Sequence, residues 1–203
     1  MVVYDVETIR PIATGNKKLD SNYQYASGWK DYKGMGISVA CFYDYNSDHI
    51  FIYKESDFQD VNRLRELQNL LNGVGVISGF NIKKFDNGLL HAHGIEVPMA
   101  KCYDLLENLW FAVGLDPHNF DVKTHGGYSL DKVLAVNFRD VQKTMNGYHA
   151  PFMWQDGKYN EVIDYCKNDV MVEKALLDRI FQTGGLIDPK SKKFVRMSIP
   201  RGF

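Results

Sequence analysis

The sequence predicts an α/β fold with one mixed sheet flanked by helices, and the order of its patterns indicates this. Residues 2–8, 35–45 and 49–55 are rich in strand formers, and the turn signal "NSD" separates the last two. Beyond residue 55, helical periodicity alternates with short apolar runs. Strands that first form a meander and then alternate with helices predict a sheet that is antiparallel at first and parallel afterwards.

The first half of the chain gives each element a local reason. Residues 11–34 are polar, contain glycine and show no period, so we expect a long loop after the first strand. The segment 56–73 begins with a capping residue, places leucines at helical spacing and ends at Gly73, which predicts a helix. Residues 74–80 are a short apolar run between glycines, typical of a buried strand.

The second half continues the alternation of strands and helices. The longest helical pattern covers residues 158–183 and ends at two glycines, and the segment 139–157 matches no pattern. The other expected elements are a short helix over 83–94, a strand over 100–106 that passes into a helix, a helix over 129–138 capped by Ser129, and a hairpin with its turn at 188–192.

Length and composition predict one ordinary globular domain. We expect a single domain over residues 1–203, with a loop excursion at 11–34 and a C-terminal hairpin or tail at 186–203. The sequence is 45% hydrophobic and 24% charged, with a net charge of -1. This balance does not indicate a strong nucleic-acid binder, although a local basic patch is compatible with it.

The distribution of cysteines and apolar residues indicates in which cellular compartment the protein is expected. The three cysteines are widely spaced and form neither a disulfide framework nor a zinc pattern. The N-terminus lacks a signal-peptide pattern, and no apolar run approaches the ~18 residues of a membrane span. We therefore expect a cytoplasmic protein with no membrane partner, and the sequence carries no signal for its oligomeric state.

Two acids on the first strand need an explanation. Side chains alternate along a strand, so Asp5 and Glu7 point to the same face, roughly 7 Å apart. Like charges repel, and burial increases the penalty. Because residues 1–9 contain no Lys or Arg, a bound cation is one candidate for compensation. The alternative is that the strand frays into solvent at this point.

Two further acidic sites have both structural and functional interpretations. Asp86 follows a predicted buried strand and opens a helix, where the helix dipole favours an acid, and Asn81 stands in the preceding turn. Tyr165 and Asp169 are four residues apart and share one face of the long helix. Asp169 lies close to an apolar stripe, where an acid requires a partner, unless the pair is an exposed contact.

Together these residues resemble a known family. The patterns "DVE" at 5–7, "NxxxFD" at 81–86 and "YxxxD" at 165–169 resemble, in order, the three motifs of the DEDD superfamily. These are the DnaQ-like 3′–5′ exonucleases, which have a ribonuclease-H-like fold. "SLDKVLAVNF" is similar to the helix before the third motif in members related to B-family polymerase proofreading domains. The resemblance spans residue 2 to about residue 180.

The last motif indicates the branch of the superfamily. In one branch a His stands five residues before the last Asp, but position 164 of this chain is Asp. Tyr165 stands four residues before Asp169, as in the DEDDy branch. The resemblance implies a metal-dependent 3′–5′ exonuclease that uses two divalent ions, Mg²⁺ or Mn²⁺, ~3.5–4 Å apart.

The resemblance also implies a role for each site residue. Asp5 would bridge both ions, Glu7 and Asp169 would complete the first ion's site, and Asp86 would hold the second ion. Tyr165 would orient the attacking water. The residues expected to shape the substrate end are Thr8, Asn81 and Phe85.

The implied partner is the single-stranded or frayed 3′ end of a nucleic acid, with DNA favoured over RNA. Other readings are an endonuclease on the same fold and a non-catalytic nucleic-acid-binding module. Lys83 and Lys84 stand beside Asp86, where they would meet phosphates or lie in a solvated turn. A basic face or a scattered charged surface would be formed by Lys123, Lys132, Arg139 and Lys143, with Tyr128 between them.

Overall fold

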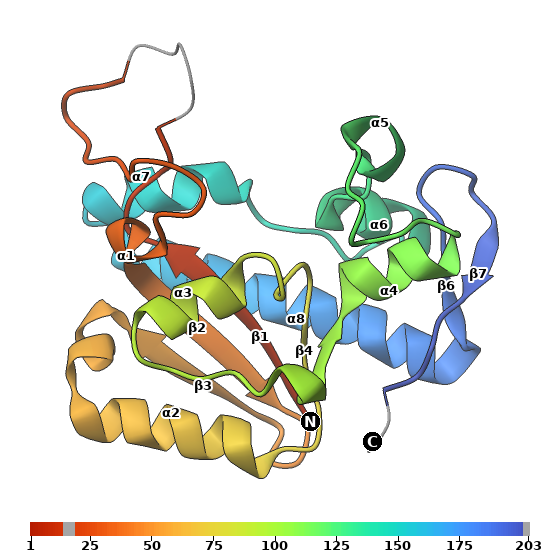
Figure 1. The fold of residues 1–203 in the computed structure, drawn as a ribbon, viewed down its shortest axis with the longest axis horizontal. Helices are drawn as coiled ribbons and strands as arrows, with labels where there is room; N and C mark the ends of the chain where they lie inside the picture. The colour runs from red at the N-terminus through yellow and green to blue at the C-terminus, as the bar shows by residue number, and fades with distance from the viewer. Residues whose placement is uncertain (14–18, 201–203) are drawn as a thin grey trace.

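A five-stranded mixed sheet forms the centre of this computed structural model, which describes residues 1–13 and 19–200 (Figure 1). The strand order is β3-β2-β1-β4-β5. β1 and β2 pair antiparallel, as do β2 and β3, whereas β4 pairs parallel with β1 and with β5. The predicted order of antiparallel and then parallel strands is confirmed. The strands are β1 (Val2–Thr8), β2 (Ile37–Asp44), β3 (His49–Lys54), β4 (Ile77–Gly79) and β5 (Cys102–Asp104).

Helices cover both faces of the sheet, and a hairpin follows the longest helix. The α-helices are α1 (Tyr32–Met35), α2 (Val61–Gly73), α3 (Asp86–Ala92), α4 (Leu105–Ala112), α5 (Val122–His125), α6 (Leu130–Asn137), α7 (Ala150–Gln155) and α8 (Tyr159–Thr183). Short 3₁₀ turns are η1 (Glu55–Gln59), η2 (Met99–Lys101) and η3 (Gly147–His149), and the hairpin strands are β6 (Gly185–Ile187) and β7 (Phe194–Arg196). Gly184, in the left-handed region, ends α8 as the sequence predicts.

The alternation of side chains along β1 divides the core into two halves. Val3 joins the half that α8 covers, and Tyr4 joins the half that α2 and α3 cover (Figure 1). The long helix α8 packs directly on β1 and β2. Polar side chains on the α8 face of β1 are therefore enclosed between strand and helix, and this position creates the candidate site described below.

The structure differs from the sequence expectation in how some helices begin. The helix expected from residue 56 begins at Val61, because the side chain of Asp60 accepts a hydrogen bond from the amide of Asn62, and η1 precedes it. Ser129 stands at the N-cap of α6, but its side chain makes no capping hydrogen bond. Asp60 and Ser56 are both capping residue types, so the sequence alone does not choose between them.

Two segments without a sequence pattern lie around the site. The described parts of the 11–34 loop contain an isolated bridge between Ile12 and Ala26, and the loop ends in α1. A Cβ added at Gly88 of α3 would lie 2.6 Å from the Tyr32 ring, so the absence of a side chain there allows α1 to approach α3 closely. The segment 139–157 contains η3 and α7. Residues 14–18 and 201–203, parts of the predicted loop and tail, lie outside the described residues.

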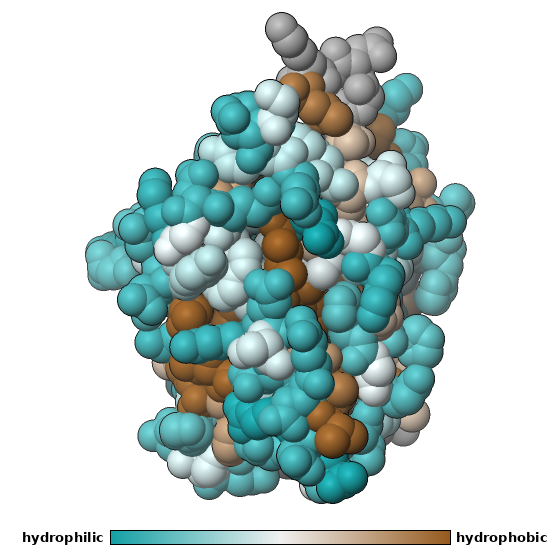
Figure 2. Space-filling model, turned by 90° about the vertical axis from the view of Figure 1, so that its left-hand side faces the viewer, coloured by the Kyte–Doolittle hydropathy of each residue, from teal (hydrophilic) through white to brown (hydrophobic). Residues whose placement is uncertain are grey.

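Figure 2 shows a face that is mostly hydrophilic, with hydrophobic residues visible in separate places between polar ones. Among the described residues, none of the helices has the length and apolar character needed to cross a bilayer.

Candidate functional site

Three carboxylates meet where α8 crosses β1. Asp5 and Glu7 lie on the strand, and Asp169 lies on the helix. One carboxylate oxygen from each lies within 4.8 Å of the others. The period of two on β1 aligns the first two acids, and the packing of α8 on β1 brings the third acid to them. Glu7 and Asp169 are buried, whereas Asp5 is half-buried.

Asp86 reaches the same place from the start of α3, the helix that follows β4. The parallel ladder between β1 and β4 ends at Val3, so β1 extends beyond its partner. The amide of Val6 on this extension donates to Asp86 Oδ1 at 3.2 Å. The Asp86 carboxylate is buried at the start of α3 and lines the same cavity, but it is outside the group of three oxygens.

The donor set fits a hard divalent cation. Asp5 Oδ2 and Asp169 Oδ1 are buried and accept no hydrogen bond from any described residue. An unpaired buried carboxylate oxygen is costly, and Mg²⁺ or Mn²⁺ prefers such oxygen ligands. The hydroxyl of Tyr165 is also buried without a partner in the described chain. The cluster can therefore hold a metal ion.

The pKa values show how strained the cluster is without a cation. Burial, followed by the charge of Asp169, raises the pKa of Asp5 to about 7. Burial and the charge of Asp5 raise the pKa values of Glu7 and Asp86 well above the usual range. Burial also raises the pKa of Asp169, although Lys143 opposes this. Near neutral pH the metal-free cluster therefore retains protons, which a bound cation would displace.

Lys143 supplies a positive charge that the sequence did not place here. Its Nζ lies 2.6 Å from Asp169 Oδ2 and 5.1 Å from the centre of the Tyr165 ring. Only 16% of the side chain is exposed, so Lys143 belongs neither to a surface basic face nor to a scattered charged surface, the two expectations from the sequence. Burial alone would lower the pKa of Lys143, but Asp169 and Asp5 outweigh this and raise it. Of the described residues that line this cavity, Lys143 alone is cationic.

A fifth carboxyl group, Glu173, lies beneath the cluster. It follows Asp169 by one helical turn and is 1% exposed, and its Oε2 has no hydrogen-bond partner in the described part of the chain. Burial, then the charges of Asp5 and Asp169, raise the pKa of Glu173 well above its usual value. The spacing of four from Asp169 is the signal in the sequence that would have identified it.

Asp104 fixes the loop that carries Asn81. Its carboxylate accepts hydrogen bonds from the amides of Asn81 and Lys83, each at 3.0 Å, and it also caps α4 by accepting from Leu106. Asn81 has a φ of 68°, in the left-handed region that Asn tolerates better than most residues. The hydrogen bonds to Asp104 therefore hold an otherwise unfavourable turn at the edge of the site.

All eight predicted site residues line one cavity of about 360 Å³. The structure thus brings Thr8, Asn81 and Phe85 to the acids, while the individual roles expected for them stay predictions. The sequence missed the positions of Trp29, Lys143 and Tyr148, which also line the cavity. Trp29 lies in the 11–34 loop and the other two in 139–157, the segments without periodicity.

The solved structures with a similar fold include a DNA polymerase. The fold is similar to the family B DNA polymerase from the hyperthermophilic archaeon Pyrobaculum calidifontis, with a TM-score of 0.57 and 15% sequence identity. The match covers 89% of this chain and 24% of the polymerase chain, so the chain spans about a quarter of that protein. No protein-family model and no curated protein matches the sequence. At this identity the likeness shows a shared fold.

Proposed function

We propose that this chain has a ribonuclease-H-like fold and is a metal-dependent 3′–5′ exonuclease of the DEDDy type. The observation that carries the proposal is the convergence of Asp5, Glu7 and Asp169, with one oxygen from each within 4.8 Å of the others. Asp86 and Tyr165 line the same cavity, which supports the proposal. The likeness to a DNA polymerase supports a role on nucleic acid.

The carboxylates would serve as ligands. Asp5, Glu7 and Asp169 would hold one divalent ion, and Asp5 with Asp86 would hold a second. When bound, such ions neutralise the phosphate and lower the pKa of a water molecule. The ions would also offset the burial and the mutual repulsion that raise the pKa values of Asp5 and Glu7. A phosphodiester therefore fits this cavity only when cations offset the carboxylate charge.

Tyr165 would orient water or phosphate by donating a hydrogen bond. Burial, then the charges of Glu7 and Asp169, raise the pKa of Tyr165 well above its usual value, so the hydroxyl keeps its proton. A protonated phenol is a donor and not a base. This hydroxyl makes no well-formed hydrogen bond among the described residues but lies beside Asp169, so it would turn from that carboxylate to a ligand in the cavity.

The substrate would be the 3′ end of a single strand. Thr8, Asn81 and Phe85 line the cavity beside the acids, where they would contact the terminal nucleotide. A cavity of about 360 Å³ lies near the lower end of the ~300–1,000 Å³ range of small-ligand sites. This size suits one terminal unit of a strand better than an intact duplex, and we propose single-stranded DNA as the preferred substrate.

The test is digestion of 5′-labelled DNA and RNA oligonucleotides with Mg²⁺, Mn²⁺ or EDTA. We expect a ladder of products shortened from the 3′ end, which requires metal and disappears in Asp169→Ala. Circular single strands should stay intact, since an exonuclease needs an end, and their cleavage would indicate an endonuclease instead. Failure to shorten any substrate with either metal would refute the proposed activity.

A further inference from the structure

The outer edge of β6 in the C-terminal hairpin is closed by a side chain. Ile187 of β6 stands opposite Phe194 of β7. The backbone of Ile187 nevertheless turns away from β7, because its amide donates to Asn137 Oδ1 at 2.8 Å and its carbonyl accepts from Asn137 Nδ2 at 3.0 Å. The amide group of Asn137 therefore covers this edge as a neighbouring strand would.

The outer edge of β7 is open. The carbonyl of Lys193 and the amide of Met197 form hydrogen bonds on the β6 side. Backbone groups alternate between the two sides of a strand, so those of Phe194 and Arg196 point away from β6. No residue in the described part of the chain forms a hydrogen bond with these outward groups. The edge therefore offers amides and carbonyls to a further strand.

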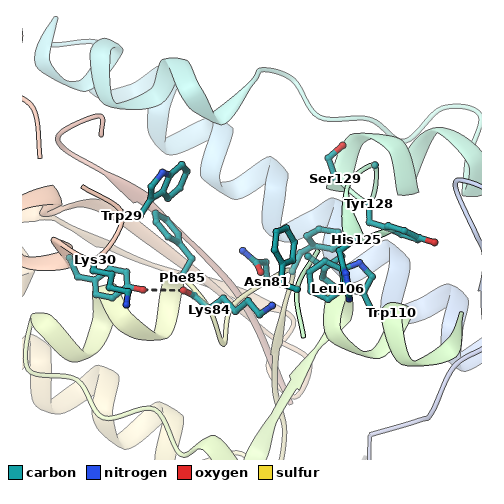
Figure 3. Close-up of a pocket in the computed structure, with 14 residues that line it drawn as sticks. Trp29, Lys30, Asn81, Lys84, Phe85, Leu106, Trp110, His125, Tyr128 and Ser129 are labelled. Carbon is teal, nitrogen blue, oxygen red and sulfur yellow. Dashed lines mark hydrogen bonds between the residues drawn. The ribbon is translucent and has the colours of Figure 1, made fainter. Parts of the chain in front are cut away.

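A cavity of about 610 Å³ lies between the hairpin and the helices α4 and α5, which are neighbours in Figure 1. Lys190 fixes the hairpin against α5, because its Nζ donates to the carbonyl of Thr124 at 2.6 Å. Tyr128 lines this cavity and also the cavity of Figure 3, where its hydroxyl points away from Trp29 and Phe85. The apolar residues that line the hairpin cavity are Ala112, Val113, Leu115, Phe194 and Val195.

The rim of this hairpin cavity is basic. Lys123, Lys190 and Lys193 line it, and all three are exposed. Asp188 is the one acid in the described lining, and it is buried. Its carboxylate accepts hydrogen bonds from the amides of Lys190 and Ser191, so it is committed to the turn. The cavity therefore combines an apolar lining with unopposed positive charge.

We propose that the open edge of β7 binds an extended acidic segment of a partner protein, which pairs with β7 as a third strand. Residues 190–196, KSKKFVR, carry four basic side chains and no acid. Two copies of this chain paired through β7 would bring these like charges together, so a second copy is a poor occupant. A segment that alternates acidic and apolar residues complements the charge and fills the hairpin cavity. The proposal does not depend on nuclease activity.

Synthetic peptides test the strand pairing directly. The probe is a fluorescein-labelled peptide of four Glu-Val repeats, titrated with the wild-type protein and followed by anisotropy. Two further peptides carry N-methyl groups on all valines or on all glutamates, which preserves charge and apolar character. In one of them the methyl groups face β7 and remove hydrogen bonds, so it should bind about 5- to 100-fold more weakly than the unmodified peptide. Equal binding of all three, or no saturable binding of the unmodified peptide, would overturn the proposal.

A charge reversal tests the electrostatic part. Arg196→Glu should weaken binding of the unmodified peptide roughly 2- to 30-fold, because attraction becomes repulsion at an exposed position. The matched control is Lys158→Glu, which changes the net charge equally at the opposite end of α8 and should bind like the wild type. Equal weakening in both variants would overturn the proposal. So would displacement of the peptide by a single-stranded oligonucleotide in EDTA, which would assign this surface to nucleic acid.

Discussion

Asp5→Asn should stabilise the metal-free protein above neutral pH. The pKa of Asp5 rises from its usual 3.8 to about 7, a difference of about 3 units, because burial and Asp169 oppose its ionisation. At about 1.4 kcal/mol per unit, the full penalty for ionising Asp5 is about 4 kcal/mol. Asp5 is only half-buried, so water screens part of this, and we expect a gain of about 2–3 kcal/mol.

The sign follows from proton binding. Since the folded state holds the proton of Asp5 more tightly than the unfolded chain, wild-type stability falls as the pH rises from about 4 to about 7. Asn does not titrate, so Asp5→Asn lacks this decline. The difference in the free energy of unfolding should therefore be small near pH 4 and complete near pH 8.

The assay is thermal unfolding in EDTA, followed by circular dichroism at both pH values. For a chain of this size, 2–3 kcal/mol corresponds to a rise in Tm of about 5–10 °C at pH 8. The control is Asp164→Asn on the exposed side of α8, where the ion pair with Lys167 contributes little. An Asp5→Asn variant that melts at or below the wild-type temperature at pH 8 would refute the electrostatic reasoning.

Three other variants probe the same cluster. Lys143→Met should lower the Tm in EDTA at pH 8, in contrast to Asp5→Asn, because it leaves the Asp169 carboxylate without the ammonium group 2.6 Å away. An unchanged Tm would show that this ion pair is not formed. Tyr165→Phe should leave the Tm unchanged or raise it, since it removes a buried hydroxyl that has no hydrogen-bond partner in the described chain, but it should reduce turnover of labelled oligonucleotides about 10- to 100-fold. Turnover at the wild-type rate in Tyr165→Phe would contradict the proposal that the Tyr165 hydroxyl orients water or phosphate. In Gly147→Ala the new Cβ would lie 3.2 Å from the Tyr165 hydroxyl and would displace it. Single-turnover kinetics should therefore show a slower reaction, while the Tm stays normal. A rate equal to that of the wild type would argue against contact between residue 147 and the Tyr165 hydroxyl.

The strand and helix patterns made much of the site predictable. A period of two on β1 placed Asp5 and Glu7 on one face, and the spacing of four on α8 placed Tyr165 and Asp169 together. Asp86 was predictable as the first residue of a helix after a buried strand. These positions depend on local periodicity, which a sequence records directly.

The residues that the sequence missed depend on tertiary packing. Lys143 lies in a segment with no period, and only the fold brings it to Asp169. Trp29 reaches the cavity of the acidic cluster because the loop that carries it ends in α1, which packs on α3. Asp104 was read as a strand residue, yet its carboxylate fixes Asn81 from a neighbouring strand. Long-range contacts of this kind leave no spacing signal along the chain.

The most direct test of the metal centre is anomalous diffraction from crystals grown with Mn²⁺. We predict a peak within coordination distance, roughly 2.0–2.6 Å, of oxygens from Asp5, Glu7 and Asp169, and loss of that peak in Asp5→Asn. Absence of any peak at these three carboxylates, in a protein that still degrades oligonucleotides with Mn²⁺, would contradict the assignment of the site.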